Sequence, residues 1–182
     1  MVYHTTIFSI GGWTPNVTLK TTEYIFTNGH VANGPVNLPG TRAGHCLLKN
    51  SDTVILIGGY DPTNHTSYTS TVWMFDANNN FSLTVGPSMK HTRNHHACGI
   101  FQSSAHSGKV VSTFNYACFD CSVFMPIQQY TTRIEKKPFH LGRPLVVAAG
   151  GRGNQEDTPN TSEFWDFTVP GSEWQLSKSL SM

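Results

Sequence analysis

The segment Val54-Ile55-Leu56-Ile57-Gly58-Gly59 decides the fold of this chain, because a short apolar run followed by a glycine pair occurs three times. The other two copies end at Gly11-Gly12, after residues 6–10, and at Gly150-Gly151, after residues 145–149. Each apolar run predicts a buried strand, and the glycines let the backbone turn tightly where the strand ends. A second strand, with small polar residues followed by aromatic ones, is predicted further along at residues 21–24, 71–76 and 162–167.

This recurrence predicts an all-β repeat protein. A unit of about 45 to 50 residues with several strands in each copy is typical of a β-propeller blade. Residues 1–107 would hold a partial first blade, a second blade and the start of a third, and residues 143–182 would continue the third blade to a truncated end. We expect the six paired glycines to be structural residues that allow backbones to approach closely.

Two further segments share a motif at matching places in the repeat. Arg42 and His45 precede one apolar strand, and Arg93 and His96 precede the next. The order of an Arg-x-x-His segment, an apolar strand ending in Gly-Gly, an aromatic strand and a Trp-bearing strand resembles the kelch repeat. The resemblance covers most of the chain and implies blades of four antiparallel strands around a central channel.

The number of copies predicts an incomplete ring. A closed propeller takes ~4 to 8 blades, whereas this chain holds material for three. Open blades expose unpaired strand edges, which invite association. Two explanations stay open: the chain is a fragment of a longer protein, or it completes a ring by self-association through those edges. The kelch pattern is also imperfect, because Arg152 stands where the other copies have an aromatic residue after the glycine pair.

Residues 108–142 form a predicted insertion that fits neither the repeat nor its neighbours. It would lengthen one hairpin loop far beyond the usual size. Gly108-Lys109 can be encoded with a splice-donor signal and Leu141-Gly142 with an acceptor signal, and joining the two restores a glycine codon in frame. One hypothesis is therefore a retained intron, and the other is a long, partly ordered or disordered loop.

The four cysteines predict neither a metal centre nor a disulfide framework. Cys118 and Cys121 form the only Cys-x-x-Cys, and because no second such pair accompanies them, no metal ligands are assigned. Cys46 and Cys98 follow the two Arg-x-x-His motifs, and we assign them to equivalent positions in neighbouring blades. Equivalent strands of neighbouring blades should lie too far apart for a bond, so we expect two buried free thiols.

No catalytic or cofactor-binding residues are predicted. His45 and His96 recur in the repeat, so we expect structural imidazoles that hydrogen-bond a neighbouring strand or loop. Arg42 and Arg93 should tie adjacent segments together through carbonyls or a carboxylate. The sequence holds no Gly-x-Ser-x-Gly elbow and no phosphate-binding glycine loop, and no pair of carboxylates suggests acid–base catalysis.

Composition argues against two classes of partner. The formal net charge is +1, without a Lys/Arg cluster, which argues against nucleic acid. No apolar run approaches the ~18 residues of a membrane span. Four Asn-x-Ser/Thr sequons supply candidate glycosylation acceptors at Asn16, Asn64, Asn80 and Asn160. They keep an extracellular ectodomain open as an alternative to a cytoplasmic protein, which we favour.

The predicted function follows from the scaffold: a non-enzymatic module whose loops bind a partner protein. The contact loops would follow the glycine pairs, at residues 13–20, 60–67 and 152–160. The kelch resemblance implies a cytoskeletal partner or a ubiquitin-ligase substrate. The alternative is a propeller enzyme of the sugar-oxidase or sialidase type, which would need a metal or a centre rich in arginines and carboxylates.

Overall fold

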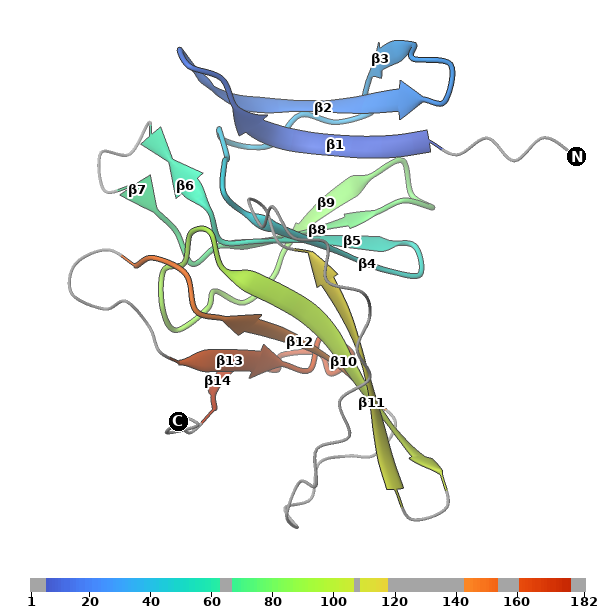
Figure 1. Cartoon of the computed structure of the whole chain (residues 1–182), viewed down its shortest axis with the longest axis vertical. Coiled ribbons are helices and arrows are strands. Elements are labelled where there is room, and N and C mark those ends of the chain that lie inside the picture. Colours follow the sequence, from blue (N-terminus) through green and yellow to red (C-terminus); the bar gives the residue numbers. More distant parts are fainter. Residues whose placement is uncertain (1–5, 63–66, 107–108, 118–142, 154–160, 178–182) are drawn as a thin grey trace, which may run out of the picture.

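A computed structural model of the chain describes residues 6–62, 67–106, 109–117, 143–153 and 161–177 (Figure 1). The strands in these residues form three antiparallel sheets, which follow one another along the chain, and one small hairpin. The described residues contain no α-helix, and the three sheets do not close into a ring. The prediction of an all-β, incomplete propeller-like arrangement is confirmed.

The first two sheets come from the first half of the chain. Sheet 1 has the order β1-β2-β3, with β1 (Thr6–Trp13), β2 (Thr18–Phe26) and β3 (Val31–Asn33). Sheet 2 has the order β4-β5-β8-β9, with β4 (Cys46–Asn50), β5 (Thr53–Ile57), β8 (Val72–Asp76) and β9 (Ser82–Val85). Between β5 and β8, the short strands β6 (Tyr60–Asp61) and β7 (Ser67–Tyr68) form a separate hairpin.

Sheet 3 combines four repeat strands with one strand from the predicted insertion. Its order is β11-β10-β12-β13-β14, with β10 (Ala97–His106), β11 (Lys109–Ala117), β12 (Pro144–Ala149), β13 (Ser162–Trp165) and β14 (Gln175–Leu176). The start of the insertion is therefore a strand, β11, which pairs with β10. The rest of the insertion, with Cys118 and Cys121, lies outside the described residues. The retained-intron hypothesis stays a prediction about the transcript.

Strand pairing gives the three sheets a common register. The last strand residue before each glycine pair lies opposite Thr22, Val72 or Ser162, on the strand that follows the pair in sheets 1, 2 and 3 respectively. One step along that strand, Glu23, Trp73 and Glu163 occupy equivalent positions. At two of these positions the side chain contacts a buried arginine: Trp73 contacts Arg42, and Glu163 contacts Arg93.

Backbone hydrogen bonds join each sheet to the segment before the next one. The Gly12 N–H donates to the Arg42 carbonyl at 2.8 Å, and the Gly59 N–H donates to the Arg93 carbonyl at 2.7 Å. Because the same bond forms at both junctions, successive sheets are joined in the same way.

Two hydrophobic layers fill the spaces between the sheets. Ile10 and Phe8 of sheet 1 pack with Leu56, Trp73 and Phe75 of sheet 2. The second layer joins sheets 2 and 3 and is made by Cys46, Leu48, Ile55, Ile57, Val72, Met89, Cys98, Ile100, Val146, Ala148, Trp165 and Trp174. Each layer buries apolar side chains from two sheets, so hydrophobic burial holds neighbouring sheets together.

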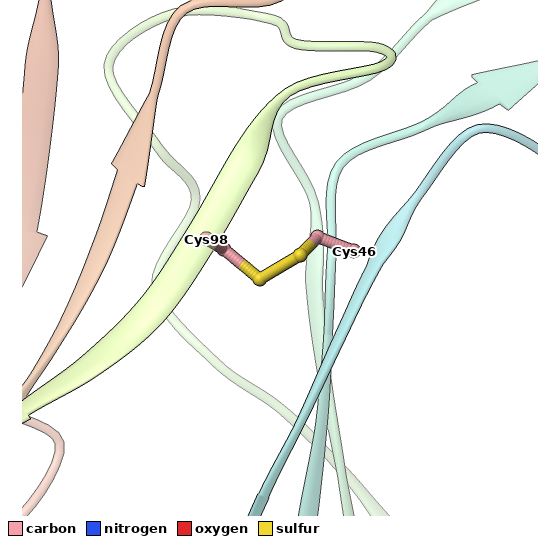
Figure 2. The surroundings of a disulfide bond; sticks show 2 residues. All are labelled: Cys46 and Cys98. Carbon is pink, nitrogen blue, oxygen red and sulfur yellow. A yellow bond between two sulfur atoms is a disulfide. The ribbon is translucent and has the colours of Figure 1, made fainter. Parts of the chain in front are cut away.

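The expectation of two free thiols was wrong: Cys46 and Cys98 form a disulfide between sheets 2 and 3, with their Cα atoms 6.1 Å apart (Figure 2). The error lies in treating the two positions as equivalent. Cys46 pairs with Ile57, before the glycine pair, whereas in sheet 3 the matching residue is Ala97, and Cys98 comes one residue later. Successive side chains point to opposite faces of a sheet, so the offset turns the two sulfur atoms toward each other.

Candidate functional site

A row of backbone hydrogen bonds runs across the three sheets at the ends where the glycine pairs lie. The Gly12 N–H donates to the Arg42 carbonyl. Ala43, which follows Arg42, pairs with Tyr60 through two backbone hydrogen bonds, one in each direction. Gly59 in turn binds the Arg93 carbonyl, and Asn94 forms the matching bridge with Arg152. The residues that follow the three glycine pairs, Trp13, Tyr60 and Arg152, are therefore positioned along one edge of the molecule. We call this edge the rim and define it as Trp13, Val17, Tyr60, Tyr68 and Arg152.

The most exposed large hydrophobic side chain of the rim is Trp13, with 68% of its surface accessible, and Val17 is 53% exposed. A register irregularity between Ile10 and Gly12 interrupts the pairing of β1 and β2 just before Trp13. Such irregularities commonly redirect a side chain. The hairpin tip is closed by Thr14, whose Oγ1 donates to the Val17 carbonyl at 3.0 Å. Two apolar side chains are thus held out in solvent on a hydrogen-bonded turn.

The β6–β7 hairpin continues the rim. Tyr60 lies opposite Tyr68, and the ring centroids are 6.1 Å apart. The Thr41 hydroxyl donates to Asp61 Oδ1 at 2.9 Å, which ties this hairpin to the segment before β4. Both tyrosine rings are partly exposed, and Arg152 is exposed at the end of the row.

Behind the rim, Arg93 and Glu163 form a wholly buried ion pair, with both side chains 0% exposed. Glu163 Oε1 accepts from Arg93 Nε at 3.1 Å and from Nη2 at 3.0 Å. The other Arg93 contacts are to the Gly150 carbonyl at 2.7 Å and the Thr161 hydroxyl at 3.0 Å. The Glu163 carboxylate also accepts from the backbone N–H groups of Lys90 and His91. Arg93 and Glu163 are both closed to solvent, and both make hydrogen bonds to other groups of the protein. We therefore assign this ion pair a structural role.

Arg42 occupies the same place in the repeat but has a different partner. Its guanidinium carbon lies 4.3 Å from the ring centroid of Trp73, the residue equivalent to Glu163. Burial lowers the pKa of Arg42 to about 10, and the negative charge of Asp61 acts in the opposite direction. Nε and Nη1 of Arg42 have no hydrogen-bond partner within the described residues. The prediction that both arginines tie segments together through carbonyls or a carboxylate is confirmed for Arg93. For Arg42 it stays a prediction beside the observed cation–π contact.

The two repeat histidines are buried and neutral. Burial, reinforced by the charge of Arg42, lowers the pKa of His45 to about 4, although a backbone hydrogen bond with Ile10 raises it. Burial and the charge of Arg93 lower the pKa of His96 to about 3. The ring nitrogens of His96 find no partner in the described part of the chain, contrary to the expected hydrogen bond. A buried imidazole with so low a pKa is poorly suited to general acid–base catalysis near neutral pH.

All six repeat glycines have a positive φ, but they differ in how closely other atoms approach. A Cβ atom placed on Gly58 would lie 2.6 Å from the Arg93 carbonyl oxygen, and one on Gly11 equally close to the Arg42 oxygen. At Gly150 and Gly12 a Cβ would meet no described atom within 4 Å. The close approach expected at each pair is therefore made in the third pair by Gly151, whose Cβ would lie 2.7 Å from the His96 Cβ. Gly150 itself meets no described atom, because the described residues hold no further sheet beyond sheet 3.

Of the predicted glycosylation acceptors, Asn16 and Asn80 are exposed at hairpin tips, and Asn64 and Asn160 lie outside the described residues. No group of three or more His, Cys, Asp or Glu side chains that could hold a metal ion occurs among the residues described. Within the same residues, no helix has the length and apolar character needed to cross a membrane. No protein-family model matches the chain, and no curated protein matches it.

Proposed function

We propose that this chain is a non-enzymatic, kelch-like interaction module and that its rim binds a partner protein. The observation that carries the proposal is the exposure of Trp13 and Val17 at the edge of the molecule that also holds the Tyr60–Tyr68 hairpin. Tryptophan, tyrosine and arginine dominate binding energy in protein interfaces. A large apolar side chain held out in solvent on a well-ordered turn can bury its surface against a partner at little entropic cost.

The support for binding over catalysis comes from the polar groups behind the rim. Arg93 and Glu163, the buried ion pair there, are closed to solvent and hydrogen-bonded to the protein's own groups. The exposed side chains of the rim are instead suited to contact, because they are large and mostly apolar.

The test compares two exposed valines at opposite ends of β2. Val17, at the rim, is 53% exposed, and Val31, which pairs with Ile25 at the far end, is 51% exposed. A partner identified by cross-linking in cells would be purified and titrated against the wild type and the variants Trp13→Ala, Val17→Ala and Val31→Ala. We expect Trp13→Ala to weaken binding at least ~10-fold, or about 1.4 kcal/mol, Val17→Ala to weaken it less, and Val31→Ala to bind as the wild type does. Equal affinities for all four proteins would contradict the proposal.

An extracellular ectodomain is the second candidate setting for this function. The Cys46–Cys98 disulfide favours it over a cytoskeletal or ubiquitin-ligase role, because disulfides persist in oxidising compartments and are rare in the cytosol. Metal analysis of the purified protein tests the enzyme alternative. Stoichiometric copper would favour a sugar oxidase over a binding module.

A further inference from the structure

The hairpin that joins β8 to β9 displays the sequon Asn80-Phe81-Ser82 in an unusual way. Asn80 and Phe81 both adopt left-handed backbone conformations, with φ of 49° and 54°. Asparagine adopts such angles more readily than most residues, but they are costly for an aromatic residue. The Ser82 N–H donates to the Asn79 carbonyl at 2.8 Å and closes the turn.

Packing of Phe81 holds this turn in place. Its ring lies 4.8 Å from the ring of Phe8 and 6.5 Å from that of Tyr24, centroid to centroid, in the layer between sheets 1 and 2. The residues on either side, Asn80 and Ser82, are exposed. The middle residue of the sequon is therefore anchored in the protein, while the acceptor amide and the hydroxyl residue both face solvent.

The other described sequon, Asn16-Val17-Thr18, differs in the burial of its hydroxyl residue and in its place on the molecule. Its hydroxyl residue, Thr18, is buried, and its acceptor lies at the rim beside Val17. The Asn80 turn lies at the opposite end of sheet 2 from the rim, since β8 starts opposite Ile57 and ends at Asp76, opposite Thr53. A large polar group on Asn80 would leave the rim accessible.

The Cys46–Cys98 disulfide indicates the type of compartment in which the chain folds. Cys46 and Cys98 are buried and bonded between two sheets. Disulfides form and persist in oxidising compartments such as the lumen of the endoplasmic reticulum, where asparagine-linked glycans are also attached.

We propose that Asn80 carries an N-linked glycan, added in the compartment where the Cys46–Cys98 bond forms. In the transfer, Asn80 Nδ2 bonds to the anomeric carbon of an oligosaccharide donated by a pyrophosphate-linked lipid. The bond between that carbon and the phosphate oxygen breaks, the lipid pyrophosphate leaves with the electron pair, and Nδ2 releases one proton. This proposal does not depend on the binding role of the rim.

The test starts from the chain as its own cells make it. The protein is digested under non-reducing conditions, treated with peptide N-glycosidase in heavy-oxygen water, and analysed by mass spectrometry. We expect the Asn80 peptide to carry the label as aspartate and the Cys46 and Cys98 peptides to be linked. An unmodified Asn80 peptide would overturn the proposal, whether the two cysteines are linked or free.

A variant set expressed in the same cells assigns the site. Asn80→Gln and Ser82→Ala should each abolish the glycan at this position, since one removes the acceptor and the other the sequon hydroxyl. Asn16→Gln should retain the glycan on Asn80. If the glycosidase shifts the mobility of Asn80→Gln as much as that of the wild type, another acceptor carries the glycan and the assignment to Asn80 is wrong.

Discussion

Arg93 Nη2 lies 3.0 Å from Glu163 Oε1, although the two residues are 70 positions apart and neither side chain is exposed to solvent. The pair connects the segment before β10 with β13, two strands away in sheet 3. In sheet 2 the equivalent arginine, Arg42, faces Trp73 instead. The same structural position is thus held by an ion pair in one sheet and by a cation–π contact in the other.

Replacing one partner of the buried pair should be strongly destabilising. In Glu163→Gln the Arg93 charge loses its counter-ion while staying buried, and breaking such a pair costs about 3–5 kcal/mol. We expect a loss of this size in the free energy of unfolding, measured by urea denaturation monitored by tryptophan fluorescence.

The matched control for this variant is Glu173→Gln. Glu173 forms an exposed ion pair with Lys90, Nζ to Oε2 at 2.9 Å. Exposed pairs contribute little, so the urea midpoint should hardly change. If both variants lost the same stability, the burial of the Arg93–Glu163 pair would not be responsible.

The two buried histidines should make the fold sensitive to acid. The pKa of His45 is about 4 and that of His96 about 3 in the folded chain, against 6.5 ordinarily. Below pH 6.5 the unfolded chain therefore binds protons that the folded chain does not. The free energy of unfolding should fall with decreasing pH by up to about 1.4 kcal/mol per pH unit for each histidine. The contribution of His45 should continue to about pH 4 and that of His96 to about pH 3.

His96→Gln tests the origin of this slope. Glutamine does not titrate, so the variant should lose about half of the pH dependence between pH 6 and pH 4, whatever its stability at pH 7. Urea denaturation at half-unit pH intervals measures the slope. A slope unchanged from the wild type would show that His96 is not the source.

Opening the disulfide should cost stability without separating the sheets. The bond closes a loop across 52 residues, for which chain entropy gives about 4 kcal/mol. The double variant Cys46→Ala, Cys98→Ala should melt at a lower temperature and lose its response to dithiothreitol, while the wild type melts at a lower temperature when reduced. A wild-type melting temperature that dithiothreitol does not alter would contradict the bond.

The sequence predicted the sheets well because two of the glycine pairs directly follow the ends of β5 and β12. The first pair does not mark a strand end, since β1 continues through it to Trp13. Leu56-Ile57-Gly58 reads as a buried strand and a turn without knowledge of any distant residue. The pairing of Arg93 with Glu163 could not be predicted in this way. The loops between the glycine pair and the next strand differ in length, so Glu23, Trp73 and Glu163 line up only when the strand register is known.

The disulfide shows a related limit. The signal that could have found it was in the sequence: one residue separates Arg-x-x-His from Cys98, and none separates it from Cys46. In a strand, that single residue changes the face to which a side chain points. The two motifs are therefore not equivalent, and Cys46 and Cys98 point to opposite faces of their strands relative to the repeat.

The central claim is that successive sheets pack through the glycine pairs, and the variants Gly58→Ala and Gly150→Ala test it most directly. The two glycines have nearly equal φ, 59° and 65°, so the left-handed strain of about 1–2 kcal/mol is common to both. Only the Gly58 methyl group would overlap the Arg93 carbonyl oxygen of the next sheet, 2.6 Å away.

The measurement is urea denaturation of both variants beside the wild type. Overlap with a neighbouring backbone adds about 1–3 kcal/mol, so Gly58→Ala should be less stable than Gly150→Ala by that amount. Equal losses in the two variants would contradict the packing of sheet 2 against the segment that leads into sheet 3.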